Sequence, residues 1–331
     1  MDFAGAVDSV LEATIVPSFT RIGPAVRSRL DHWGPPASGL DGRVIVITGA
    51  TSGLGLTAAR AWASAGATVE IVARNPEKAA ATRDRLQAEV ADAHIGIVVA
   101  DTGDLAAVHR AADELRGRHA RIDALVHNAG ALDATYSTNP DGIEQTIASQ
   151  VVGPFLLSAL LYDALVGAEP GRIIWVSSGG MYTEPLAVDR LTMDAEVYNG
   201  TTAYARAKRA QVTLCEMMAE RVDPGRLVVH AMHPGWALTP GVERSLPTFR
   251  RVVGPLLRSP DEGADTLVWL AADDGAPRNT TGSFWLDRRV RPLHKRSNTR
   301  DSDDPAERRR LWEWVVDTSK TEFPPGAAHD G

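Results

Sequence analysis

The sequence predicts one α/β domain, in which a doubly wound parallel sheet of about seven strands lies between two layers of helices. Short β-branched runs alternate with helical segments over residues 41–290, and no linker-like stretch interrupts them. This alternation is typical of parallel sheets, because each connection between parallel strands requires roughly a dozen residues or more, usually a helix. We therefore expect a three-layer α/β/α domain.

Seven runs have the composition of buried parallel strands. Each is short and rich in β-branched or other apolar residues, and most end in small or polar residues. The strands are expected at residues 43–49, 67–73, 94–101, 122–130, 171–178, 226–235 and 282–287. Five helices are expected between them, at residues 55–66, 76–90, 104–119, 143–166 and about 202–222.

Two flanking segments lie outside this alternation. Residues 1–40 are expected to form an N-terminal extension of two short amphipathic helices. Such helices either pack across the protein's own domain or bind a membrane surface or a partner. Residues 291–331 form a polar C-terminal tail with a short helix. We expect its charge run to be solvated, while the apolar segment 311–316 covers part of the domain.

Composition narrows the class of protein. The net charge of −7 argues against a nucleic-acid-binding protein, which would show a basic balance. Cys215 is the only cysteine, and its apolar neighbours predict a buried, inert thiol. No apolar run approaches the roughly 20 residues that span a bilayer, and the N-terminus lacks the basic region of a signal peptide. We expect an unprocessed cytoplasmic protein without a metal site, since His127 and His233 lack metal-ligand spacing.

A glycine-rich turn, "TGATSGLG", follows the first strand and precedes the first helix. Gly49 allows a tight turn, while Gly53 and Gly55 let the backbone approach a phosphate. The N–H groups at the start of the helix then point toward a pyrophosphate. This context favours a Rossmann-type dinucleotide site over a turn without a ligand. The expected contacts from the turn are Gly49, Thr51, Ser52, Gly53, Leu54 and Gly55.

The end of the second strand indicates which dinucleotide binds. NAD-binding proteins place an acidic residue about 20 positions after the turn to hold the ribose hydroxyls. Ala73 occupies that position here, and Arg74 follows it. A guanidinium suits a phosphate and cannot accept a hydrogen bond. Ser52 and Asn75 add further hydrogen-bonding groups, so NADP(H) is preferred over NAD(H).

Tyr204 and Lys208 lie four positions apart, which places them on the same face of a helix. A chance pair on a solvated surface is the alternative. Of the five tyrosines, only Tyr204 is followed by a lysine four residues later. A free phenol with a pKa of about 10 is a poor base at neutral pH, and an adjacent ammonium favours the phenolate.

Six motifs in order make the chain resemble the short-chain dehydrogenase/reductase family. The resemblance covers residues 41–290 and rests on "TGATSGLG", "DTGDL", "HNAG", "WVSSGGM", "YARAK" and "HPGWALT". Longer runs, such as "VSSGGMYTEPL" and "GADTLVWLAA", are similar to the branch called dehydrogenase/reductase family member 12. That branch implies little about the substrate.

The resemblance implies a reaction and its catalytic residues. Tyr204 would be the general acid/base, and Lys208 would lower its pKa and hold the nicotinamide ribose. Ser178 would bind the substrate oxygen. Hydride would pass between the nicotinamide and a carbonyl carbon while Tyr204 transfers the proton. The alternative is a non-catalytic dinucleotide-binding protein that acts through a partner.

Further cofactor contacts follow from the same resemblance. Asn128 would bond neighbouring backbone, while Ala129 and Gly130 would lie against the cofactor. Asp101 and Thr102 are expected beside the adenine. Near the nicotinamide we expect Pro234, Gly235 and Thr239. His127 and His233 are interpreted as structural.

The chain departs from the family pattern at two places. Gln150 stands where many members have an asparagine that completes a proton relay through the lysine; it either bridges a water or weakens the relay. The 26 residues from Ser178 to Tyr204 are about twice the usual separation, and this insert is expected to cover the substrate site or to pack as a surface loop. An apolar site suited to a lipophilic ketone, aldehyde or alcohol would be lined by Met181, Tyr182, Leu186, Trp236 and Leu238.

Relatives often form dimers or tetramers through the fourth and fifth helices. The run "IASQVVGPFLLSALL" is apolar enough for such an interface. Packing within the protein's own core explains the same pattern.

Overall fold

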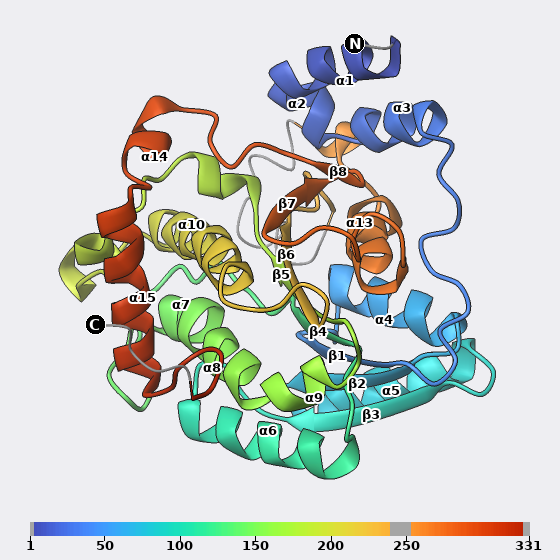
Figure 1. Cartoon of the computed structure of the whole chain (residues 1–331), viewed down its shortest axis with the longest axis horizontal. Coiled ribbons are helices and arrows are strands. Elements are labelled where there is room, and N and C mark those ends of the chain that lie inside the picture. The colour runs from blue at the N-terminus through green and yellow to red at the C-terminus, as the bar shows by residue number, and fades with distance from the viewer. Residues whose placement is uncertain (1–2, 239–252, 327–331) are drawn as a thin grey trace.

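An eight-stranded sheet in the order β3-β2-β1-β4-β5-β6-β7-β8 forms the centre of the molecule (Figure 1). The computed structural model describes residues 3–238 and 253–326. The strands are β1 (Val44–Thr48), β2 (Thr68–Ala73), β3 (His94–Val99), β4 (Ala124–His127), β5 (Gly171–Val176), β6 (Leu227–Met232), β7 (Ser283–Leu286) and β8 (Arg289–Val290). The seven predicted strands are confirmed and all run parallel, whereas the two-residue β8 pairs antiparallel with β7.

The direction in which successive strands are added to the sheet reverses between β1 and β4. From β1 the strand order runs one way through β2 and β3, and the other way from β4 through β8. Open α/β sheets bind ligands at the carboxyl ends of the strands on either side of such a reversal, here β1 and β4. Thr48 ends β1 and His127 ends β4 at this edge.

Helices cover both faces of the sheet (Figure 1). On one face lie α4 (Gly53–Ser64), α5 (Pro76–Glu89) and α13 (Pro260–Ala272). On the other lie α6 (Leu105–Arg118), α8 (Gly153–Leu160) and α10 (Gly200–Ala219). Two apolar clusters, one on each side of the sheet, form the core. Helix α13 was not among the predicted helices, although Ser259 and Glu262 supply a capping box at its start.

The helix predicted over residues 143–166 is not continuous. The structure divides it into α7 (Gln145–Ile147), a π-helical turn (Ala148–Val152), α8 and α9 (Tyr162–Val166). Gly153 follows the π turn, and a Cβ there would lie 1.7 Å from the Thr102 carbonyl oxygen. Pro154 then removes a backbone donor. The π turn thus lies where the helix packs closely against the turn after β3, and the predicted helix is broken only at Leu161.

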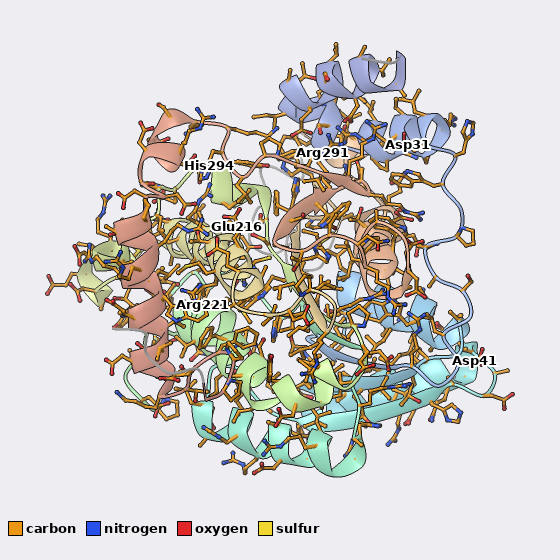
Figure 2. The ribbon with its side chains drawn as sticks, viewed as in Figure 1. Asp31, Asp41, Glu216, Arg221, Arg291 and His294 are labelled. Atoms are coloured by element: carbon orange, nitrogen blue, oxygen red, sulfur yellow. The ribbon has the colours of Figure 1, made fainter. Side chains whose placement is uncertain are left out.

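The N-terminal extension forms three helices, α1 (Phe3–Ala13), α2 (Ile15–Phe19) and α3 (Ile22–Leu30), that pack on the β8 end of the sheet (Figure 1). A buried group of charges, here called the ion cluster, joins them to the domain. Arg27, which is fully buried, bonds Asp8 and Asp287 at 2.6 Å each. Asp287 also pairs with Arg258 at 2.6 Å. Arg291, labelled in Figure 2, binds Asp8 at 2.7 Å.

The C-terminal tail contains α14 (Ser297–Asp301) and α15 (Pro305–Ser319), and α15 lies across α8 and α10 (Figure 1). Leu311 and Val315 are buried there, and the Trp312 ring meets the Phe155 ring at 5.4 Å. The expectation of a solvated charge run was wrong in part, because Arg308 binds Glu216 of α10 at 2.9 Å (Figure 2). The apolar face of α8 is thus covered by the chain itself.

None of the helices in residues 3–238 and 253–326 is both long enough and apolar enough to cross a bilayer. Cys215 is buried on α10, and burial raises the pKa of its thiol, as an inert cysteine requires.

Candidate active site

The ends of β1 and β4 are tied together by Asn128. Its Nδ2 donates to the carbonyl oxygens of Thr48 at 3.0 Å and Gly49 at 3.1 Å. In return, the Thr48 hydroxyl accepts from the backbone N–H groups of Asn128 and Ala129. The predicted bonding of Asn128 to neighbouring backbone is confirmed. Thr48 was missed as its partner, although it opens the glycine-rich motif.

The glycine-rich turn has the backbone geometry that its glycines allow. Gly49 and Gly53 have positive φ angles of 72° and 55°, a region that side chains disfavour. A Cβ at Gly49 would also lie 2.8 Å from the Ala129 Cα. Gly55 was expected to let the backbone approach a phosphate, but the structure gives another reason for its small size. A Cβ there would lie 2.5 Å from Asn128 Nδ2, so Gly55 serves close packing within the fold.

The residues of this turn fit the phosphates of a dinucleotide. Helix α4 begins directly after the turn, and its N-cap residue Ser52 makes no side-chain capping bond. The first N–H groups of α4 therefore have no side-chain acceptor at the cap, and the positive end of the helix dipole lies at the glycine-rich turn. Thr51 and Leu54 are partly buried beside them. The arrangement suits an anion held by backbone donors.

Arg74 is the exposed residue that directly follows β2. It makes no ion pair or hydrogen bond with the residues that the structure describes. Ala73 before it is buried and offers no acceptor. The side chain of Asn75 caps α5 by accepting from the backbone N–H of Lys78 at 2.7 Å, so only its amide donors remain for a ligand.

Asp101 and Thr102 form the turn after β3. The Asp101 carboxylate accepts from the N–H of Gly103 at 2.8 Å, and the Thr102 hydroxyl donates to the Ser149 carbonyl at 3.1 Å. These bonds hold the turn against the π-helical segment. Contact of the two residues with an adenine stays a prediction.

Ser178, Tyr204 and Lys208 meet at the carboxyl end of β5. Ser178 follows that strand, and Tyr204 reaches it from the first turns of α10, where the two hydroxyl groups share a hydrogen bond. The Lys208 ammonium lies 5.1 Å from the centre of the Tyr204 ring. The fold thus brings together the three residues that the sequence singled out for catalysis.

The electrostatics of this group differ from the expectation. Burial raises the pKa of Tyr204, and the hydrogen bond with Ser178 lowers it only in part. Burial also lowers the pKa of Lys208 from 10.5 to about 7. Burial and Ser178 are thus the two influences on the pKa of Tyr204, while burial destabilises the charged form of Lys208 beside it.

Gln150 projects from the π-helical turn toward the same group. Its Nε2 donates to the Ala131 carbonyl at 2.8 Å, and its buried Oε1 finds no donor within the described part of the chain. A Cβ at Gly130 would lie 3.0 Å from Gln150 Oε1 and 3.2 Å from the Lys208 nitrogen. Gly130 is therefore the close-packed neighbour of both side chains.

Gln211 joins Gln150 to Lys208, and the sequence analysis missed it. Its Oε1 accepts from the Lys208 ammonium at 3.2 Å, and its Nε2 donates to the Gln150 carbonyl at 2.7 Å. Lys208 also donates to the Val176 carbonyl at 3.0 Å. The spacing of three residues after Lys208 was the available signal, since such residues share a helix face.

The predicted substrate-lining residues fall into two groups. Met181 and Tyr182 are buried, and the Tyr182 hydroxyl donates to the Pro292 carbonyl at 2.8 Å. Trp236 is partly buried and Leu238 is exposed, both on the turn after β6. Pro234 and Gly235 open this turn, with a φ of 69° at Gly235. Thr239 lies outside the described residues.

The insert after Ser178 forms three short 3-10 turns at Gly179–Tyr182, Val188–Arg190 and Ala195–Val197. It packs against the C-terminal tail, where the N–H of Leu186 donates to the Ser302 hydroxyl at 3.0 Å. Leu186 itself is buried. Part of the insert's apolar surface is thus used to fasten the tail.

The two histidines near the site are held in structural contacts, as expected. His127 pairs with the Ser158 hydroxyl at 2.7 Å, and His233 accepts from the N–H of Gly235 at 3.2 Å. Burial lowers the pKa of His127 to about 3 and holds the pKa of His233 well below its usual value. Both rings are therefore neutral at physiological pH.

A dinucleotide turn at the switch point of the sheet, beside a Ser–Tyr–Lys group, defines an oxidoreductase of alcohol/carbonyl pairs. Residues 43–248 match the family model for short chain dehydrogenases. The chain belongs to this short-chain dehydrogenase/reductase family, whose members use NAD(P)(H).

Individual relatives agree with this assignment. "Dehydrogenase/reductase SDR family member 12" of Homo sapiens is 33% identical over 284 residues, which cover 85% of this chain and 88% of that protein. "Putative daunorubicin C-13 ketoreductase DnrU" of Streptomyces sp. (strain C5) is 37% identical over 260 residues, covering 78% and 88%. A solved short chain dehydrogenase from Shigella flexneri, complexed with NADP, superposes with a TM-score of 0.60 at 25% identity, covering 76% of this chain and 100% of that one.

Proposed function

We propose that the protein is an NADP(H)-dependent oxidoreductase that interconverts a lipophilic carbonyl compound and its alcohol. The observation that carries this proposal is the convergence of Ser178, Tyr204 and Lys208 beside the glycine-rich turn. The bound nicotinamide would supply or accept the hydride.

Each catalytic side chain has a distinct task. The Ser178 hydroxyl donates a hydrogen bond to the substrate oxygen and stabilises its developing negative charge. Tyr204, bonded to Ser178, transfers the proton to or from that oxygen. Lys208 is held by Val176 and Gln211 and orients the ribose next to Tyr204.

Two observations support NADP(H) over NAD(H). Arg74 follows β2, is exposed and has no partner among the described residues. Position 73, where NAD-binding proteins have an acidic residue, is an alanine. An unpaired guanidinium attracts a phosphate, whereas a ribose hydroxyl pair is usually held by an acid. The Shigella flexneri relative was solved with NADP.

The lipophilic substrate is supported by the aromatic turn after β6 and by a relative. Trp236 lies on that turn beside the Phe19 ring, which also contacts the His233 ring. The Streptomyces relative is named as a daunorubicin C-13 ketoreductase. We propose a neutral, ring-bearing or long-chain carbonyl compound as substrate.

The test compares NADPH oxidation by the wild type, Tyr204→Phe and Tyr136→Phe over a panel of ketones and aldehydes. Removing a general acid/base lowers turnover by about 10²–10⁴-fold, so Tyr204→Phe should be nearly inactive. The control residue Tyr136 is exposed and contacts only the Tyr198 ring among aromatic partners in the described chain. If calorimetry shows tight NADPH binding but no compound is turned over by any of the three, the non-catalytic alternative is correct.

A further inference from the structure

Phe19, the last residue of α2, lies against two parts of the candidate active site. A Cβ at Gly179, directly after Ser178, would lie 2.6 Å from Phe19 Cε2. The Phe19 ring is 4.5 Å from the ring of His233 and 5.8 Å from that of Trp236, both on the turn after β6. A residue of the N-terminal extension thus fills the space between these two turns.

The backbone of Phe19 also builds the turn after β6. Its carbonyl oxygen accepts from the N–H of Trp236 at 2.7 Å and from Arg258 Nε at 3.0 Å. A Cβ at Gly235 would lie 2.7 Å from that oxygen and 2.3 Å from Arg258 Nε. The turn that carries Trp236 therefore takes its shape from contact with α2.

The ion cluster keeps Phe19 in place. Arg258 bonds the Ser18 carbonyl at 2.7 Å and Asp287 at 2.6 Å, while Arg27 of α3 bonds Asp287 from the other side. Removing one member of a buried charge pair is strongly destabilising, because it leaves an uncompensated charge. The position of α2 is thus specified by buried charges as well as by apolar packing.

The surroundings of Phe19 suit a neutral, flat ligand. The Phe19 and Trp236 rings meet nearly edge to face, at 86°, and Phe19 is 3% exposed, so the ring is held as a rigid, flat, apolar wall. The Lys295 ammonium lies 5.5 Å above the Phe19 ring, but it is paired with Glu12. The pairing with Glu12 makes this ammonium less available to an anionic substrate.

We propose that Phe19 is a specificity-determining residue of the substrate site, where its ring sets the width beside Ser178 and selects flat, conjugated carbonyl compounds. This inference rests on the proposed function. It makes the N-terminal extension a part of the active site. Only glycine at position 179 lets the ring come this close to the backbone next to Ser178.

The test uses two ketones with the same carbon skeleton, acetophenone and cyclohexyl methyl ketone, of which only the first is flat. Their kcat/KM values with NADPH are compared in the full-length wild type, Phe19→Leu, Phe19→Tyr and Ile15→Ala. Leucine keeps most of the volume but loses the flat ring, and tyrosine keeps the ring. Ile15 is a matched control on the same helix, 49% exposed.

The kcat/KM ratio of acetophenone to cyclohexyl methyl ketone should fall about 10-fold in Phe19→Leu, within the range of one altered apolar contact. The ratio should be preserved in Phe19→Tyr and Ile15→Ala, with NADPH affinity unchanged throughout. A parallel loss of kcat/KM for both ketones in Phe19→Leu would mean that Phe19 is only structural. An unchanged ratio would also overturn the proposal.

Failure of the proposed function gives a different pattern. In that case the wild type binds NADPH in calorimetry but turns over neither ketone. The same pair of ketones is then titrated into the NADPH-loaded proteins, and their affinity ratio replaces the kcat/KM ratio. A ratio that changes in Phe19→Leu alone supports the role of Phe19 in binding; equal ratios, or no ketone binding, reject it.

Discussion

Lys208 should lower the stability of the fold that contains it. The side chain is 2% exposed, and burial lowers its pKa from 10.5 to about 7. One pKa unit corresponds to about 1.4 kcal/mol, so keeping this lysine charged in the folded state costs on the order of 5 kcal/mol. Replacing Lys208 with the similarly shaped methionine removes this cost.

The pH dependence follows from the direction of the pKa shift. The folded pKa of Lys208 lies below the unfolded value, so the unfolded chain binds the extra proton between pH 7 and 10.5. The cost is therefore present in full below about pH 7 and disappears as the pH rises to about 10.5. Lys208→Met also leaves the Val176 carbonyl and Gln211 Oε1 without a donor, which costs about 1–3 kcal/mol.

We expect the cofactor-free Lys208→Met protein to be roughly 2–4 kcal/mol more stable than the wild type at pH 6, and no more stable at pH 10.5. Urea unfolding followed by tryptophan fluorescence at pH 6, 8 and 10 measures the difference. Lys320→Met is the matched control, since Lys320 is 78% exposed, and it should change the unfolding free energy little at any pH.

Two results would refute this reasoning. Lys208→Met could be less stable than the wild type at pH 6, or its stability difference could be independent of pH. Either result would mean that the buried ammonium is fully compensated by its two hydrogen bonds. Turnover should be lost in Lys208→Met under all these conditions, so that stability is gained at the expense of function.

Three further predictions concern the cofactor, the lysine and the tail. Arg74→Ala should weaken NADPH binding at least about 10-fold, as expected for a charge-assisted contact, and leave NADH binding unchanged in calorimetry; equal effects on both would remove the argument for NADP(H). Gln211→Leu should lower kcat more than it changes KM and should shift the pH profile of kcat, because the bridge between Lys208 and the Gln150 carbonyl is lost. Gln211→Glu restores an acceptor for Lys208 and should recover part of the rate. Leu311→Asp places a charge in the buried contact of α15 and should detach that helix, which exposes the apolar face of α8. Light scattering should then show a monomeric wild type and a variant that self-associates. An oligomeric wild type would contradict this prediction.

The alternation of strands and helices, and much of the site, could be predicted from the sequence because those signals are local. Buried parallel strands are continuous apolar runs, and the glycine turn and the Tyr204–Lys208 spacing lie within single segments. The seven parallel strands followed from these patterns, whereas the meeting of Ser178 with Tyr204 was implied by the resemblance to the short-chain dehydrogenase/reductase family.

The tertiary structure alone decided the features that depend on contacts between distant segments. Gln211 acquires its role only because the π-helical turn brings the Gln150 carbonyl to it. Phe19 reaches Gly179 from 160 positions away, which no local pattern could indicate. The pKa of Lys208 likewise depends on burial, and burial is set by the packing of α10 against the sheet, which a spacing of four residues does not specify.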